Sequence, residues 1–320
     1  NIYAQQNNNH SFHMTVTDLK SFIGILILSG YHRLPRQHMY WESAADSGVE
    51  LVKNSMPYKN FKLMKKYLHF NNNSKIDGTD KLFKLRPLIR SLNQNFMKFG
   101  IFEKNISIDE QMIPYTGKHS IKMFMKNKPI RFGFKQWIMA SSSGYIYQFK
   151  VYTGKSENYS HEFGLGGSVV NGFTDQLKDT SDISLYFDNF FTSHKLIYEL
   201  KKRGINATGT VRQNRIKKCP VLMPKIMGKR VRGEYETFKE RNTNIYCIQW
   251  NDTKPVTIMS NCFSTYPLKC VKRYFRTPKK YAHVNQPFMV YMYNKFMGGV
   301  DLADNSIACY RINIKGKKWY

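Results

Sequence analysis

The sequence contains few acidic residues, no paired cysteine motif and no long apolar run. Its five cysteines are odd in number and include no Cys-x-x-Cys pair, which argues against a disulfide framework and against a zinc motif. The longest apolar run, residues 22–28, is far too short to span a bilayer, and no signal peptide precedes it. We therefore expect an intracellular protein with no membrane partner.

Basic residues greatly outnumber acidic ones. The chain has 50 Lys and Arg against 22 Asp and Glu, which gives a net charge of +28 at pH 7. Such a charge favours a polyanionic partner, above all nucleic acid. An acidic membrane surface fits less well, because the charge is not laid along an amphipathic helix. A basic surface that serves solubility alone is the other alternative.

Two of the scarce acids stand where buried strands are predicted. Asp109 lies in a short β-branched run, and Asp188 follows the apolar residues 183–187, so we expect both on strands of parallel type. Glu110 is adjacent to Asp109, but successive side chains of a strand point to opposite faces. We therefore expect Glu110 to lie elsewhere.

A third acid belongs to a predicted helix. Residues 287–305 have apolar side chains at helical spacing, which places Asp301 on a helix. Asp304 is three residues further on and shares its face. Three acids that are far apart in sequence could thus meet only in a folded domain.

Carboxylates from separate elements suit divalent ions. Mg²⁺ and Mn²⁺ are hard cations that prefer oxygen ligands, and two such ions can activate a water and steady the leaving oxygen of a phosphodiester. The pattern therefore indicates a two-metal nuclease site with Asp109, Asp188 and Asp301 as metal ligands. The alternative is that these residues form turns and caps, a common role of Asp.

The distribution of charge favours the metal site. Residues 105–200 hold 10 basic and 9 acidic residues, whereas residues 201–282 hold 20 and 4. The near-neutral central segment is thus flanked by basic segments. This suits an enzyme in which carboxylates without counter-charges bind metal ions, while the basic segments neutralise DNA phosphates.

Helical signals dominate the first hundred residues. Residues 15–30 begin with Thr15 and Asp18 in capping-box spacing, and further helices are predicted at residues 57–69 and 81–99.

Strands and helices alternate after this helical part. We predict, in order, a strand, a hairpin, a helix, a strand, a helix and a strand, at residues 106–112, 132–152, 163–178, 183–187, 193–203 and 207–211. This order, followed by a helix with the last acid, is typical of an RNase H-like domain. The predicted fold class is therefore α/β, with an RNase H-like catalytic domain and a mainly α-helical domain.

A basic β-rich insertion interrupts that order at residues 212–283. Turn residues separate strands predicted at residues 234–238, 245–250 and 256–260. Aromatic side chains between the cations could stack on nucleic acid, although aromatics in strands commonly belong to a core. The predicted DNA-binding residues are Lys217, Lys218, Lys229, Arg230, Arg232, Lys272 and Arg273.

The chain resembles the piggyBac transposases and their domesticated vertebrate derivatives. The resemblance runs through essentially the whole chain in ordered blocks, among them YLHFNNN, DKLFKLRPL, SIDEQM, NKP, FDNFFTS, GTVR and YNKFMGGVDLAD. It implies that the family's catalytic aspartates fall on Asp109, Asp188 and Asp301, with Asp304 a further acid of the site.

The resemblance also implies an activity. The expected reaction is Mg²⁺- or Mn²⁺-dependent nicking at a transposon end, attack of the freed 3′-hydroxyl to form a hairpin, and joining into TTAA targets. The alternative is a domesticated DNA-binding protein with vestigial acids that acts in chromatin or transcriptional regulation. Double-stranded DNA is the expected partner, a homodimer the expected assembly, and the nucleus the expected location.

The resemblance divides the chain as well. The family continues beyond the last residues with more of the helical domain and a cysteine-rich zinc module, so we expect a fragment of a longer protein. The implied parts are a helical dimerisation and DNA-binding domain, an RNase H-like core, the basic insertion, the last catalytic helix and the start of a return to the helical domain, at residues 1–104, 105–211, 212–283, 284–305 and 306–320.

Overall fold

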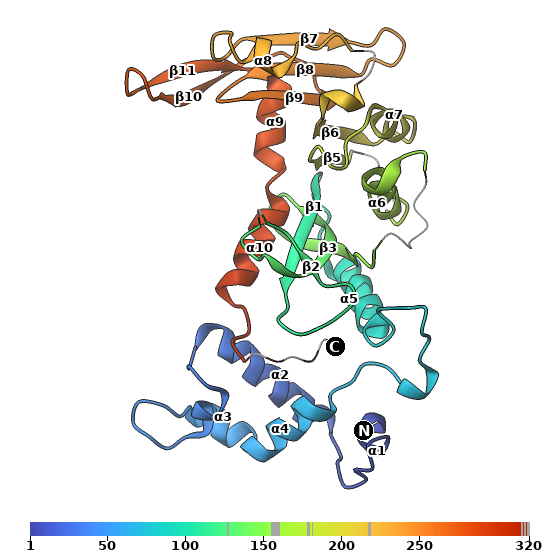
Figure 1. Ribbon diagram of the computed structural model, residues 1–320, viewed down its shortest axis with the longest axis vertical. Helices are drawn as coiled ribbons and strands as arrows, with labels where there is room; N and C mark the ends of the chain where they lie inside the picture. Colours follow the sequence, from blue (N-terminus) through green and yellow to red (C-terminus); the bar gives the residue numbers. More distant parts are fainter. Residues whose placement is uncertain are drawn as a thin grey trace.

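The computed structural model describes residues 1–126, 128–154, 161–177, 180, 182–216, 219–314, 316 and 318. The molecule is elongated, with helices α1 to α4 at one end, a sheet flanked by helices in the middle and a β-rich part at the other end (Figure 1). None of the described helices is both long and apolar enough to cross a membrane. The five cysteines are free thiols.

The helical end forms its own small core. Phe22, Ile25, Phe61 and Met64 are buried together there. Thr15 accepts a hydrogen bond from the Asp18 amide and donates its own amide hydrogen to the Asp18 carboxylate, so the predicted capping box is confirmed. The helices are α1 (Ile2–Gln5), α2 (Val16–Tyr31), α3 (Glu50–Ser55) and α4 (Tyr58–Tyr67), with 3₁₀ turns η1 (Gln37–Trp41) and η2 (Asn73–Lys75).

Helix α5 (Arg86–Phe99) begins five residues later than the helix predicted at residues 81–99. Asp80 explains the difference, because its carboxylate accepts hydrogen bonds from the Leu82 amide and the Arg86 guanidinium and so holds the intervening residues in turns. Pro87 then stands in the first turn of α5, where its missing amide hydrogen costs nothing.

A nine-stranded sheet runs from the middle of the molecule to its β-rich end (Figure 1). Its order is β2-β3-β1-β5-β6-β9-β8-β7, and β4 pairs with β3. The pairs β1–β5 and β5–β6 are parallel, as predicted for the strands of Asp109 and Asp188, while β1 and β3 are antiparallel. The strands of this middle part are β1 (Asn105–Pro114), β2 (Met123–Phe124), β3 (Phe132–Ser141), β4 (Ile146–Val151), β5 (Ser184–Phe187) and β6 (Asn206–Thr210).

The predicted insertion strands exist and continue this same sheet. Strands β7 (Tyr235–Lys239), β8 (Tyr246–Asn251) and β9 (Pro255–Ser260) are antiparallel, and β9 pairs directly with β6. Strands β10 (Lys269–Phe275) and β11 (Lys280–Gln286) form a separate hairpin that projects from the side (Figure 1). Between β6 and β7 lie the short helices η3 (Gln213–Arg215) and α8 (Pro224–Met227).

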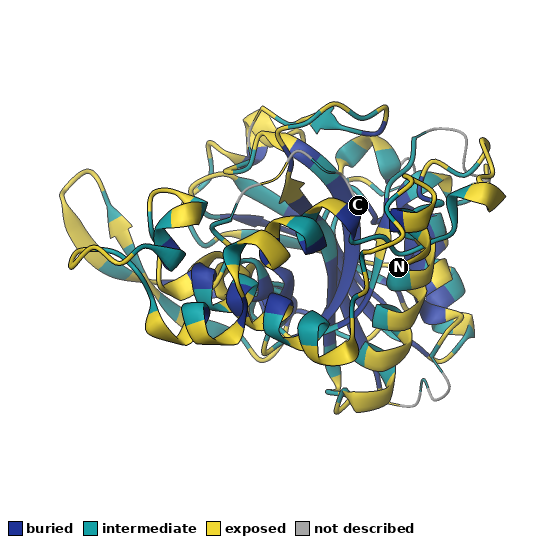
Figure 2. Ribbon diagram, turned by 90° about the horizontal axis from the view of Figure 1, so that it is seen from below, coloured by how far each residue is buried: buried dark blue, intermediate teal, exposed yellow. Residues whose placement is uncertain are grey.

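Helices cover both faces of the central strands. Helices α6 (Gly164–Thr174) and α7 (His194–Lys202) pack on one face with Ile106, Ile108, Leu185 and Phe187. The other face holds α9 (Phe288–Phe296) and α10 (Gly299–Cys309). Figure 2 shows the strands as the buried centre, surrounded by helices with exposed outer surfaces.

The single helix predicted at residues 287–305 is wrong in one respect, since the structure has two helices that meet at Met297 and Gly298. Gly299 lies so close to β3 that a Cβ atom there would be 2.0 Å from the Ser141 carbonyl oxygen. The break and the missing side chain let α10 approach the sheet.

Candidate active site

Asp109 and Asp188 lie where the parallel pairing between β1 and β5 ends. The last residue pair between β1 and β5 is Ile108 with Phe187, and each aspartate is the next residue along its chain. Adjacent strands are about 4.8 Å apart, so this register places the two acids side by side.

Asp301 and Asp304 approach from α10. Val300, in the first turn of this helix, is buried against Ile138 of β3, and Asp301 follows it. Gln111, on the same face of β1 as Asp109, donates a hydrogen bond from Nε2 to Oδ1 of Asp304. The structure thus brings all four predicted aspartates to the region where the parallel pairing of β1 and β5 ends.

Burial controls the protonation of the first two acids. Burial, together with the nearby charge of Asp188, raises the pKa of Asp109 to about 7, although the Glu110 amide donates to Oδ1 of Asp109 at 2.7 Å. Burial also raises the pKa of Asp188, against a 2.8 Å hydrogen bond from the Phe190 amide. These carboxylates share one electrostatic environment that lacks sufficient counter-charge.

The carboxylates of the site fit a divalent ion, although they do not form a complete coordination shell by themselves. Among the residues that the structure describes, no three histidine, cysteine or acidic side chains are arranged to hold a metal. Mg²⁺ usually takes only one or two protein carboxylates and completes its shell with waters and substrate phosphates. Paired, crowded carboxylates such as Asp109 and Asp188 match that requirement.

The raised pKa of Asp109 predicts that stability falls as pH rises. In the unfolded chain this carboxyl ionises near 3.8, whereas in the fold it keeps its proton up to about 7. Between these two pH values the folded state therefore binds more protons than the unfolded chain. The free energy of unfolding is highest below this pH range and falls as pH rises through it. Asp109→Asn should remove this loss, which is on the order of a few kcal/mol. Thermal melts without divalent ions, from pH 4 to pH 7.5, measure the effect.

The exposed Asp46 provides the control for these melts, because Asp46→Asn should follow the wild-type profile. Addition of Mg²⁺ at neutral pH should stabilise the wild type and not Asp109→Asn, since the ion replaces the proton. Parallel profiles of wild type and Asp109→Asn would contradict the assignment.

Tyr293 is a site residue that the sequence reasoning missed. Its hydroxyl lies 3.5 Å from Oγ1 of Thr210, and burial together with the charges of Asp188, Asp109 and Asp301 raises its pKa. Tyr293 therefore stays a hydrogen-bond donor beside the acids at neutral pH. Tyr293 lies about two helical turns before Asp301 in the stretch predicted as one helix. This spacing could have indicated that it shares a helix face with Asp301.

Arg215 fixes the turn that follows Asp188. Its Nη1 donates to the carbonyl oxygens of Asn189, Phe190 and Thr192 at 3.0, 2.7 and 3.0 Å. Nothing in the sequence pattern links Arg215 to this turn, because the contact depends on the return of the chain after β6.

The arginines predicted to bind DNA are largely engaged within the protein. Arg232 and Arg273 both pair with Asp252, at 2.5 and 3.2 Å, and Arg230 pairs with Glu236.

The lysines predicted to bind DNA differ from these arginines. Lys229 is exposed, and Lys272 is exposed on the β10–β11 hairpin with its Nζ 4.7 Å from the Tyr281 ring centroid. Lys217 and Lys218 lie outside the described residues. The two described lysines are thus the better candidates for phosphate contacts.

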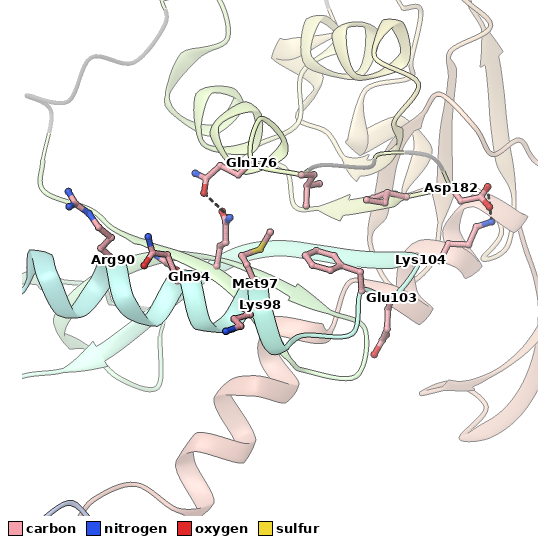
Figure 3. A pocket seen from close by; sticks show the side chains of 13 residues that line it. Arg90, Gln94, Met97, Lys98, Glu103, Lys104, Gln176 and Asp182 are labelled. Atoms are coloured by element: carbon pink, nitrogen blue, oxygen red, sulfur yellow. Dashed lines mark hydrogen bonds and ion pairs between the residues drawn. The ribbon is translucent and has the colours of Figure 1, made fainter. Parts of the chain in front are cut away.

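A large groove lies at the opposite end of the strands. It runs between α5 and the end of α6, and Lys104 and Asp182, which precede β1 and β5, line it (Figure 3). These two residues form an ion pair at 3.3 Å, and Gln148 donates to Gln176 across the groove at 2.7 Å. Asp109 and Asp188 lie further along the same strands and do not line the groove, so the groove is separate from the candidate active site.

Comparisons with known proteins agree with this architecture. A family model described as Transposase IS4 matches residues 1–320. Human PiggyBac transposable element-derived protein 3 is 42% identical across 100% of this chain, and human PiggyBac transposable element-derived protein 2 is 37% identical. The chain covers 54% of each of these proteins, so it spans about half the length of the curated relatives it matches.

A solved structure has the same fold. It is described as a piggyBac transposase synaptic complex with hairpin DNA, and it superimposes with a TM-score of 0.75 at 20% sequence identity, covering 99% of this chain and 66% of that one. The mixed α/β fold is therefore that of a piggyBac transposase. Together with the match along its whole length, this shows that the chain belongs to the piggyBac transposase family.

Proposed function

We propose that this chain is the catalytic part of a transposase that cleaves DNA and transfers strands at TTAA sites with Mg²⁺ or Mn²⁺. The observation that carries the proposal is the meeting of Asp109, Asp188, Asp301 and Asp304 where the parallel pairing of β1 and β5 ends. The accompanying assignments are a nuclear location, double-stranded DNA as substrate and a homodimer as the working assembly.

The proposal also assigns the parts of the fold. Strands β1 and β3 to β6 with α6, α7 and α10 would form an RNase H-like core, and α1 to α5 a helical domain for dimerisation and DNA binding. The strand order β3-β1-β5-β6, with helices on both faces, supports the first assignment.

The side chains of the site would have different roles in the reaction. Asp109, Asp188 and Asp301 would hold the ions, which when bound supply Lewis-acid stabilisation and an activated water. Gln111 orients Asp304 toward β1, and Arg215 holds the backbone after Asp188. Tyr293 keeps its proton and can donate a hydrogen bond to a phosphate oxygen.

A cleavage assay with the full-length protein tests the proposal. The substrates are duplexes with TTAA beside candidate terminal repeats, with Mg²⁺, Mn²⁺ or chelator. Metal-dependent nicks and hairpins are the expected result. Binding without any cleavage would instead favour the alternative of a DNA-binding protein derived from a transposase. This alternative is considered because the human relatives are named as transposable element-derived proteins.

DNA binding should depend steeply on salt because the surface is strongly basic. Each phosphate neutralised contributes about 0.9 to the slope of log K against log salt, so Lys272→Gln with Lys280→Gln should lower the slope by about 2. Both lysines are exposed on the β10–β11 hairpin. Fluorescence anisotropy at several salt concentrations measures the slope. The double variant Lys195→Gln with Lys202→Gln, at two exposed positions of α7, supplies the charge-matched control. An unchanged slope in Lys272→Gln with Lys280→Gln would exclude the hairpin from the contact.

A further inference from the structure

A lysine ammonium stands beside the strand that carries Asp109. Lys128 lies in the turn before β3, and its Nζ is 3.3 Å from Oε1 of Glu110, the residue after Asp109 on β1. The Lys128 side chain is 33% exposed, so a substrate can reach it from the solvent.

Glu110 holds this lysine in place. As predicted, Glu110 points to the face of β1 opposite Asp109, but it is not remote from the site. Its Oε2 accepts a 2.9 Å hydrogen bond from Lys135, which is 10% exposed and lies 4.0 Å from the Trp137 ring centroid. Lys135 is therefore an inner, fixed cation, and Lys128 is the outer cation that can reach a ligand.

The charge of Lys128 acts on the acid centre. It lowers the pKa of Asp109, Asp188 and Asp304 against the larger effect of their burial. Burial lowers the pKa of Lys128, but the acids around it, including Glu110 and Asp301, have the larger combined effect. The pKa of Lys128 is therefore raised above its ordinary value. Lys128 is thus the protein's own counter-charge for these carboxylates.

We propose that Lys128 is the phosphate-contacting cation of this site, positioned by Glu110. Its ammonium would donate a hydrogen bond to a non-bridging oxygen of the phosphodiester that enters the acid centre. The inference rests on the proposed function and adds to it a residue and a substrate contact.

The physical need for such a contact is direct. A phosphodiester carries a negative charge, and it must approach a group of aspartates that repels it. A lysine is a compact point charge on a flexible stem that suits a phosphate oxygen. Lys128 is placed to lower that repulsion, and its ion pair with Glu110 keeps it from folding directly onto the aspartates.

The test uses Lys128→Met and Lys128→Arg in the full-length protein. The control is Lys126→Met, because Lys126 is an exposed lysine two residues earlier in the same turn. Thermal melts confirm that each variant is folded. The first measurement is Mn²⁺ affinity without DNA, by titration calorimetry. Lys128→Met should bind Mn²⁺ about three- to tenfold more tightly, because a repelling charge has been removed.

The second measurement is single-turnover nicking at saturating Mn²⁺. Lys128→Met should be about 10- to 100-fold slower, since a group aimed at the transition-state charge is lost. Lys128→Arg should recover part of the rate, and Lys126→Met should match the wild type. The two measurements move in opposite directions, which a merely structural ion pair would not produce.

The outcomes separate this inference from the proposed function. Nicking by the wild type and by Lys128→Met at equal rates overturns the inference and leaves the proposed function standing. A wild type that never nicks overturns the proposed function. The Mn²⁺ titration needs no cleavage, so an unchanged Mn²⁺ affinity in Lys128→Met, or no Mn²⁺ binding by the wild type, overturns the inference in either case.

Discussion

Asp188→Asn is expected to abolish metal-dependent nicking while DNA binding persists or tightens. The substitution keeps the shape of the side chain and an oxygen that can accept the Phe190 amide hydrogen, so the turn after β5 should survive. It removes the charge that a divalent ion needs. Because a bound ion contributes several kcal/mol of stabilisation to the transition state, the rate should fall at least about a thousandfold.

Asp182→Asn is the matched control for this variant. Asp182 precedes the same strand, its side chain is 86% exposed, and it pairs only at the surface with Lys104. The rate of nicking and the affinity for DNA should be measured for both variants with the same duplex. Equal cleavage by Asp188→Asn and wild type would remove Asp188 from the metal site.

Gly299→Ala should damage both stability and cleavage. A Cβ at this position would lie 2.0 Å from the Ser141 carbonyl oxygen and 2.6 Å from Oγ of Ser107. The start of α10 would have to move away from β1 and β3, at a cost of about 1–3 kcal/mol. Asp301 would move with it, so nicking should fall by more than the lost stability explains.

Gly298 offers an adjacent control. A Cβ there meets nothing within 4 Å, and its φ of −76° suits any residue. Gly298→Ala should therefore keep its melting temperature within a few degrees and its nicking rate near that of wild type. Similar losses in both glycine variants would show that the close approach of α10 is unimportant.

The positions of Asp109 and Asp188 were predictable because local patterns determine them. β-branched and apolar runs ending in an acid predict strands, and the parallel register then places the acids next to each other. The capping box at Thr15 was equally local. Three expectations stay predictions: the binding of metal ions, the formation of a homodimer and the roles of the domains. The fold of a single chain does not test them.

Contacts between distant segments account for what the sequence could not predict. The break before α10 depends on how closely Gly299 meets Ser141, which helical periodicity does not show. Arg232 and Arg273 are far apart in sequence from each other, yet both bind Asp252 across the insertion. Lys128 and Glu110 meet only because the chain returns along β3 beside β1.

The pairing of β9 with β6 has a mechanical consequence. An unbroken ladder of backbone hydrogen bonds links strands β7 to β9 of the basic insertion, through β6 and β5, to the segment that carries Asp188. Such a ladder resists hinge motion, because bending it would break several bonds together. A duplex bound to these strands would therefore lie at a fixed distance from the acids, and that distance would select which phosphodiester is cut.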